Sequence, residues 1–293
     1  MLNLVLFAIV LATLSPFTPA VFPQSPSDSV RQQSQEISCY QMNAGNRAWK
    51  KKLWDGYELS LGPTPHGADN PEEACTAAIY NQAGKVVFRT TGFNTRYHDA
   101  TGMDIDGDGA PDVVLMTDAG GGNHCCWEIE VFSLRPKPHL VFTYNPAGMF
   151  SFRKDKDGNA ALWSTEGGLI EIGYSMADRP FALMVQRVIG GKLTNVTPQS
   201  CPEVFQDKRL ASDRDRLTGS EVARFTAVTK ISENDWETSL AILEIALQYI
   251  YCGHWEKAEQ VIQSMWPAYD QKRVLEVLDK EFRRIYPEAA KTP

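Results

Sequence analysis

Apolar and polar residues alternate in short runs between Cys39 and Cys201, a pattern typical of β-strands. The clearest hairpin joins residues 76–80 to residues 85–90 through a Gly-containing turn. In residues 127–134 the alternation of apolar and acidic side chains predicts a half-buried strand. Further strands are expected at residues 112–117, 140–144, 160–164, 181–188 and 193–196. Short strands at this spacing predict an all-β domain of propeller-like or sandwich architecture.

The pattern changes to a helical period after about Phe205. Thr218 with Glu221, and Asn234 with Glu237, form capping-box patterns at two helix starts. The helix that follows the second box is expected to end at Gly253. Two further helices are expected, one over residues 255–265 and one from about residue 270. The chain is therefore expected to be an α+β multidomain protein, with a β domain followed by a small α-helical bundle.

The N-terminus has the pattern of an export signal. Residues 2–14 are nearly all apolar, and a small-x-small site follows at residues 18–20. This run is shorter than the roughly 20 apolar residues that cross a bilayer, and we expect no stable membrane span elsewhere. The expected organisation is a signal peptide (1–20), a polar linker (21–37), a β domain (38–204) and a helical domain (205–293). The expected location is secreted or periplasmic.

Charge and cysteine content narrow the range of partners. The formal net charge is -7, and no Lys/Arg-rich block stands out, so we expect no nucleic-acid partner. An even number of cysteines, six, behind an export signal predicts disulfides. The pattern alone does not choose the pairing. We expect Cys201 to pair with Cys252 and the other four cysteines to pair among themselves.

The strongest chemical signal is an aspartate-rich loop over residues 104–112. Calcium binds six to eight oxygen ligands, and alternating aspartates in a tight loop direct several carboxylates inward. Gly107 and Gly109 allow turn conformations that side chains would block. The expected calcium ligands are the carboxylates of Asp104, Asp106, Asp108 and Asp112 and the carbonyl of Ala110. The alternative is a solvated Asp-Gly turn.

The aspartate-rich loop is not an EF-hand, because its twelfth position is Leu115 instead of a glutamate. It resembles the calcium loop of FG-GAP or VCBS-type repeats, the blades of integrin-α-like β-propellers. Those repeats have the pattern Asp-x-Asp-x-Asp-Gly-x-x-Asp followed by an apolar strand. The resemblance covers residues 104–115. It implies a structural calcium ion between strands of one blade and a binding surface elsewhere.

Two weaker resemblances concern the rest of the chain. Residues 155–159 are similar to a second, degenerate calcium loop, but Trp163 occupies the ninth position, so we expect a hairpin turn. About three four-stranded blades fit into the β region, fewer than a closed propeller contains. In the helical part, residues 249–267 resemble a single tetratricopeptide repeat unit. The residues that match its pattern are Tyr249, Gly253, Trp255, Ala258, Ile262 and Pro267.

A Gly-rich stretch ends in His124, Cys125 and Cys126. One interpretation is a transition-metal or redox site formed by these three residues. The other is a pair of structural disulfides, one from each cysteine, because neighbouring strand residues point to opposite faces. An export signal favours the disulfides.

The sequence favours a non-enzymatic function. No Gly-x-Ser-x-Gly, Walker, His-Glu-x-x-His or Rossmann pattern is present. We expect an extracytoplasmic binding or adhesion module with a structural calcium ion and a protein or carbohydrate ligand. One alternative is an exported hydrolase of cell-wall or polysaccharide material that uses His98, His124 and nearby acidic residues. Another is a metal or redox protein centred on His124, Cys125 and Cys126.

Overall fold

We describe the protein from a computed structural model. The residues that the structure describes are 39, 48–64, 75–118, 127–146, 148–155, 157–167, 172, 180–206, 212 and 217–288. They belong to one compact unit, Glu36–Pro293. The expected signal peptide and the expected linker, residues 1–37, lie outside the described residues, as do His124, Cys125 and Cys126.

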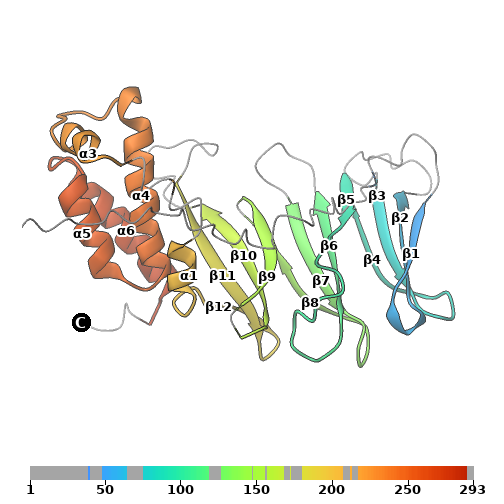
Figure 1. Ribbon diagram of the computed structural model, residues 1–293. Coiled ribbons are helices and arrows are strands. Elements are labelled where there is room, and N and C mark those ends of the chain that lie inside the picture. The colour runs from blue at the N-terminus through green and yellow to red at the C-terminus, as the bar shows by residue number, and fades with distance from the viewer. Residues whose placement is uncertain are drawn as a thin grey trace, which may run out of the picture. The chain divides into compact units, whose positions relative to one another are not determined.

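The described strands form three antiparallel sheets of four strands, and each sheet consists of four consecutive strands (Figure 1). The first sheet contains β1 (Trp49–Lys52), β2 (Glu58–Pro63), β3 (Cys75–Tyr80) and β4 (Val86–Gly92). The middle sheet contains β5 (Asn94–Tyr97), β6 (Asp112–Asp118), β7 (Trp127–Ser133) and β8 (His139–Tyr144). The third sheet contains β9 (Phe150–Lys154), β10 (Ala160–Gly167), β11 (Phe181–Ile189) and β12 (Lys192–Asn195). Each sheet is therefore a local meander.

The middle sheet is buried on both faces. Val113 and Leu115 pack with Leu59 of the first sheet, whereas Val114 and Val131 belong to a core shared with the third sheet. Side chains alternate between faces along a strand, so two covered faces bury both sets. The expectation that residues 127–134 form a half-buried strand is therefore wrong, because β7 is buried from its third residue onward.

Glu130 carries a carboxyl group into this two-sided core. Its side chain is 8% exposed, and Thr117 Oγ1 donates a hydrogen bond of 3.3 Å to its Oε2. Burial, aided by the charge of Glu128, raises the pKa of Glu130 above its usual 4.5. A raised folded-state pKa gives stability below the unfolded-state pKa, and this stability is lost as the pH rises through the folded-state pKa.

We expect Glu130→Gln to stabilise the protein at pH 8 and not at pH 4, because glutamine stays neutral. A gain of about 1 kcal/mol corresponds to a rise in Tm of about 2 to 4 °C in a domain of this size. Thermal unfolding of both proteins at the two pH values measures it, with the exposed Glu276→Gln on α6 (Gln271–Ile285) as the control. An equal effect of Glu130→Gln at both pH values would contradict the assignment.

The described helices follow the sheets and begin with α1 near the end of the β region. They are α1 (Cys201–Phe205), α3 (Gly219–Thr226), α4 (Trp236–Tyr251), α5 (Trp255–Met265) and α6 (Gln271–Ile285). The expected capping box at Thr218 and Glu221 is present at the start of α3. The box expected at Asn234 and Glu237 is wrong: Ser232 and Asp235, two residues earlier, form a capping box at the short 3₁₀ helix Glu233–Asp235, which leads into α4. Sheets followed by a helical C-terminal part confirm the α+β fold class.

The helical part packs on itself and on the third sheet. Ala258 and Ile262 of α5 are fully buried in a core that also contains Ala182 of β11. The expected helix end at Gly253 is confirmed, because this glycine adopts a φ of 80°. None of the described helices combines the length and the apolar character that crossing a membrane requires.

The side chain of Gln248 joins α4 to the free edge of β11. β12 pairs only with the second half of β11, from Gln186 to Ile189, so the earlier backbone groups on that edge lack a strand partner. Gln248 Oε1 accepts a hydrogen bond of 2.8 Å from Leu183 N, and its Nε2 donates one of 3.1 Å to Leu183 O. The fully buried amide thus takes the place of a paired strand.

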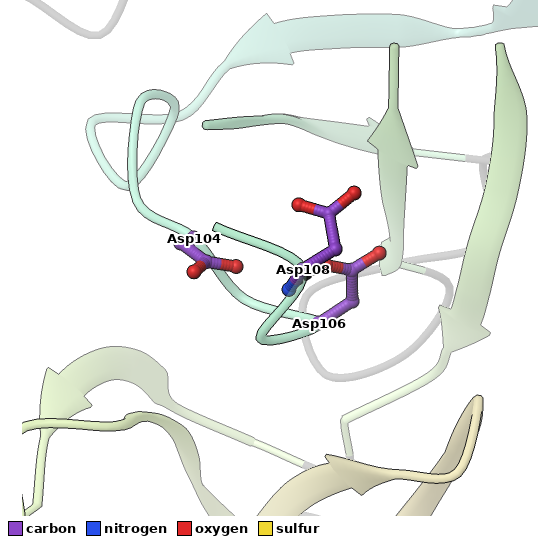
Figure 2. A group of neighbouring side chains, drawn as sticks. All are labelled: Asp104, Asp106 and Asp108. Carbon is purple, nitrogen blue, oxygen red and sulfur yellow. Dashed lines mark hydrogen bonds between the residues drawn. The ribbon is translucent and has the colours of Figure 1, made fainter. Parts of the chain in front are cut away.

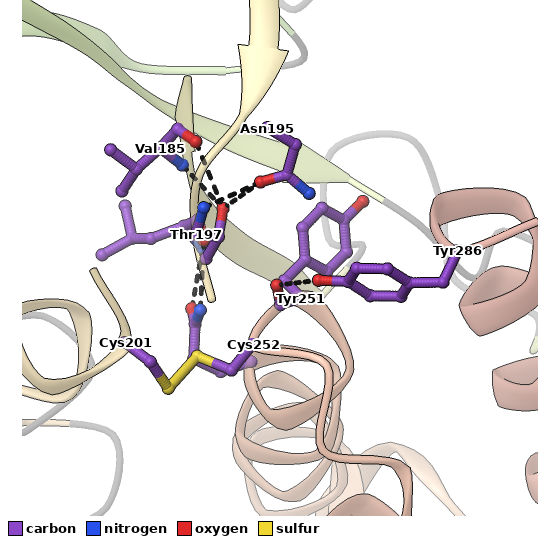
Figure 3. The surroundings of a disulfide bond; sticks show 9 residues. Val185, Asn195, Thr197, Cys201, Tyr251, Cys252 and Tyr286 are labelled. Carbon is purple, nitrogen blue, oxygen red and sulfur yellow. Dashed lines mark hydrogen bonds between the residues drawn. A yellow bond between two sulfur atoms is a disulfide. The ribbon is translucent and has the colours of Figure 1, made fainter. Parts of the chain in front are cut away.

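Two disulfides are described, Cys39–Cys75 and Cys201–Cys252. Figure 3 shows the second, which links α1 to the end of α4, where Tyr286 Oη also donates a hydrogen bond to Tyr251 O. The expected Cys201–Cys252 pairing is confirmed. Cys39 pairs with Cys75. This bond excludes disulfides from Cys125 or Cys126 to Cys39 or Cys75. Disulfides persist outside the reducing cytoplasm, so the two bonds indicate an extracytoplasmic protein.

Candidate metal centre

The aspartate-rich loop connects β5 to β6 in the middle sheet. Its base is closed by two backbone hydrogen bonds of 2.8 Å, from Gly102 N to Asp112 O and from Asp112 N to Met103 O. Gly107 and Gly109 have φ values of 79° and 85°, which other residues adopt only with strain. The glycines therefore let the chain reverse twice within a few residues.

The loop brings three carboxylates together, those of Asp104, Asp106 and Asp108 (Figure 2). One oxygen from each lies within 4.8 Å of the others. Asp104 accepts hydrogen bonds from Gly107 N at 2.8 Å and Gly109 N at 2.9 Å. Asp106 and Asp108 each accept one from the backbone two residues ahead, at 3.0 Å and 2.7 Å. The loop backbone therefore orients the carboxylates that its sequence spacing predicts to be close.

Asp112, another expected ligand, accepts hydrogen bonds from the backbone of the loop through its buried side chain. Its side chain is fully buried, and Oδ2 accepts hydrogen bonds from Ile105 N at 2.7 Å and Asp106 N at 3.2 Å. Its Oδ1 is buried without a hydrogen-bond partner among the described residues. Burial, together with the charges of Asp106 and Asp108, raises the pKa of Asp112 to about 7. Asp112 lies outside the three-carboxylate group.

Ala110 completes the set of expected ligands. It is buried at 4% exposure, and its N–H donates to Asp108 Oδ1. Like Asp112, it is not part of the three-carboxylate group. A residue that sequence reasoning missed is Ser133, whose Oγ donates to Asp108 Oδ2 at 3.4 Å. Ser133 lies at the end of β7, and no sequence signal connects it to the loop.

The three carboxylates form no ion pair in the described part of the chain, although His139 and Arg135 act on Asp106 and Asp108 at longer range. No lysine, arginine or histidine there forms an ion pair with Asp104, Asp106 or Asp108. Burial and the neighbouring charges of Asp108 and Asp104 raise the pKa of Asp106, and the charge of His139 only partly opposes this shift. The group therefore carries concentrated negative charge that a cation would relieve.

In the other two sheets, the turn between the first and second strands also contains an aspartate, but there an arginine neutralises its charge. The aspartate-rich loop lies at the same position in the middle sheet. In the first sheet Asp55 binds the guanidinium of Arg135, with Arg135 Nη2 donating to Oδ1 at 2.7 Å. In the third sheet Arg187 Nη1 donates to Asp155 Oδ2 at 2.8 Å. Among the described residues, the middle turn is the one of the three whose aspartates accept no hydrogen bond from an arginine.

The second acidic stretch is a hairpin turn, as expected. Asp155 Oδ1 accepts hydrogen bonds from Asp157 N and Asn159 N, each of 2.9 Å, and Gly158 has a φ of 84°. These bonds resemble those that Asp104 makes. Groups of acidic, histidine or cysteine side chains can hold a metal ion when their ligand atoms lie close together. Among the described residues, Asp104, Asp106 and Asp108 form the one group that meets this criterion.

His98 was a candidate for an acid–base role. Its side chain is 8% exposed and stacks on Phe150, with ring centroids 5.2 Å apart. Its Nδ1 accepts a hydrogen bond of 3.0 Å from Ala100 N. These contacts make His98 part of the core between the middle and third sheets. The other histidine of that hypothesis, His124, lies outside the described residues.

Comparison with known proteins does not assign the chain to a family. No protein-family model matches the chain, and no curated protein matches it. Among solved structures, the chain is similar to PliI-Ah, a periplasmic lysozyme inhibitor of I-type lysozyme from Aeromonas hydrophyla. The identity is 11% and the TM-score 0.26, over 35% of this chain and 91% of that one. A TM-score this low does not establish a common fold.

Proposed function

We propose that this protein is an exported, calcium-binding module in which calcium has a structural role, and that it acts in extracytoplasmic binding or adhesion. The observation that carries the proposal is the group of three carboxylates, which form no ion pair among the described residues. In the two equivalent turns an arginine neutralises the negative charge of the aspartate. A bound cation would neutralise the aspartates of the middle turn in the same way. Carboxylate oxygens are the ligands that calcium prefers.

Asp112 supports the same proposal. A buried carboxylate oxygen without a hydrogen bond is rare, because leaving it unpaired is costly. A cation bound above the loop, together with the water molecules of its coordination shell, would reduce this cost. The proposed location is secreted or periplasmic, and the proposed ligand is a protein or a carbohydrate. The resemblance to FG-GAP or VCBS-type repeats belongs to this proposal.

The test is thermal unfolding of the full mature chain in calcium and in chelator. A ligand at a hundred times its Kd stabilises the native state by about 2.7 kcal/mol, so we expect a clear rise in Tm with millimolar calcium. The rise should be smaller with magnesium, which demands a stricter octahedral geometry. In the Asp106→Asn, Asp108→Asn variant we expect the calcium effect to disappear.

The matched control is Asp157→Asn, in the equivalent turn of the third sheet, which should keep the full calcium effect. An unchanged Tm of the wild-type chain in calcium would overturn the proposal. The hydrolase and redox alternatives both depend on His124 and stay predictions.

A further inference from the structure

A cavity of about 110 Å³ lies where α1 covers one face of the third sheet. Trp163 of β10, Arg187 of β11 and Glu203 of α1 line it. Trp163 pairs with Val185, so Arg187, two residues further along β11, points to the same face of the sheet as Trp163. The exposed residues Lys154 and Asp157 also line the cavity, so it reaches the surface.

Three buried polar atoms of these lining side chains have no hydrogen-bond partner in the described structure. They are Trp163 Nε1, Arg187 Nε and Glu203 Oε2. Trp163 is 8% exposed as a whole. Buried polar groups are nearly always hydrogen-bonded, so three unpaired atoms around one cavity indicate an occupant. The occupant must accept hydrogen bonds from the indole and the guanidinium and donate one to the glutamate.

The charges around the cavity favour a neutral occupant. The guanidinium of Arg187 already forms an ion pair with Asp155 at 2.8 Å. The other charged residues that line the cavity are one basic residue, Lys154, and two acidic residues, Asp157 and Glu203. An anion would face the acidic groups, and a cation would face the two basic ones. Hydroxyl groups both donate and accept hydrogen bonds and carry no charge.

The volume limits how much of the ligand enters. About four water molecules fill a space of this size, at roughly 30 Å³ each. That matches two neighbouring hydroxyl groups and the carbons that bear them. We propose that this cavity binds the hydroxyl-bearing edge of a saccharide or of a small polyol. This site is separate from the three-carboxylate group, and the proposal does not depend on calcium.

The experiment follows the indole N–H signal of Trp163 by NMR in the full chain labelled with ¹⁵N. The signal is assigned by its loss in Trp163→Phe. The probes are glucose, galactose, N-acetylglucosamine and glycerol, each titrated in calcium and in chelator. We expect a saturable shift with at least one probe, with the same Kd in both buffers. Sugar binding alone identifies a saccharide as the source, and glycerol binding alone identifies a polyol.

A matched pair of variants locates the binding. Glu203→Gln keeps the shape of the side chain but replaces the charged acceptor, and we expect about tenfold weaker binding. Glu233→Gln, an exposed residue outside the cavity, should bind as the wild type does. The absence of any shift up to about 0.1 M of every probe, a range that covers very weak ligands, would mean that only water fills the cavity and would overturn the proposal. A shift with glycine and with none of the four probes would also overturn it, because the ligand would be a zwitterion.

Discussion

Replacing Gln248 by leucine is expected to lower the free energy of unfolding by about 2 to 4 kcal/mol. The amide is fully buried and pairs with both backbone groups of Leu183. Leucine has a similar size, so little packing is lost, but the N–H and C=O of Leu183 are left without partners at a covered strand edge. Each unpaired backbone group costs about 1 to 3 kcal/mol when water cannot reach it.

Denaturant unfolding of the purified variant measures this loss. The control is Gln263→Leu, which makes the same change on the exposed face of α5. Its effect should stay within about 0.5 kcal/mol, as for most surface substitutions. If the two variants lose the same stability, the amide of Gln248 does not join the helices to β11 as described.

Removing the Cys201–Cys252 bond is the second large effect. The bond joins residues separated by 51 positions, and the chain-entropy relation gives about 4 kcal/mol for a closed loop of this length. We therefore expect the Cys201→Ala, Cys252→Ala variant to be less stable by about 2 to 5 kcal/mol. The expected cause is a larger gain of conformational freedom when this segment unfolds.

The measurement is again denaturant unfolding under oxidising conditions, with the Cys39–Cys75 bond intact. The comparison variant Ser264→Ala, on the surface of α5, controls for a small side-chain change in the same helical part. A loss below about 1 kcal/mol for the double variant would show that the segment is already held together without the bond.

Local signals in the sequence predicted much of the fold. The hairpins β3–β4 and β11–β12 follow from turn residues between short apolar runs, and α5 begins and ends at the expected residues. β1 was missed because it contains three consecutive lysines, which carry no apolar alternation. Pairing with β2 defines this strand, with an ion pair of 2.9 Å between Lys50 and Glu58.

Long-range packing could not be predicted in the same way. Whether β7 has one or two buried faces depends on sheets that are distant in sequence. The carboxylate group was found because all its members lie within a few residues of each other. The arginines of the two equivalent turns were not found, because Arg135 and Arg187 lie 80 and 32 positions from the aspartates they bind.

The local connectivity of the three meanders has a consequence for biogenesis. Each sheet pairs strands that are neighbours in the chain, so its contacts form without waiting for distant segments. The Cys39–Cys75 bond spans 36 positions and lies before the end of the first sheet, and the Cys201–Cys252 bond lies after the third. A chain that is exported N-terminus first can therefore form the Cys39–Cys75 disulfide before the residues of the later sheets have been exported. Each described bond can close within its own segment, so correct pairing requires no contact between the two ends of the protein.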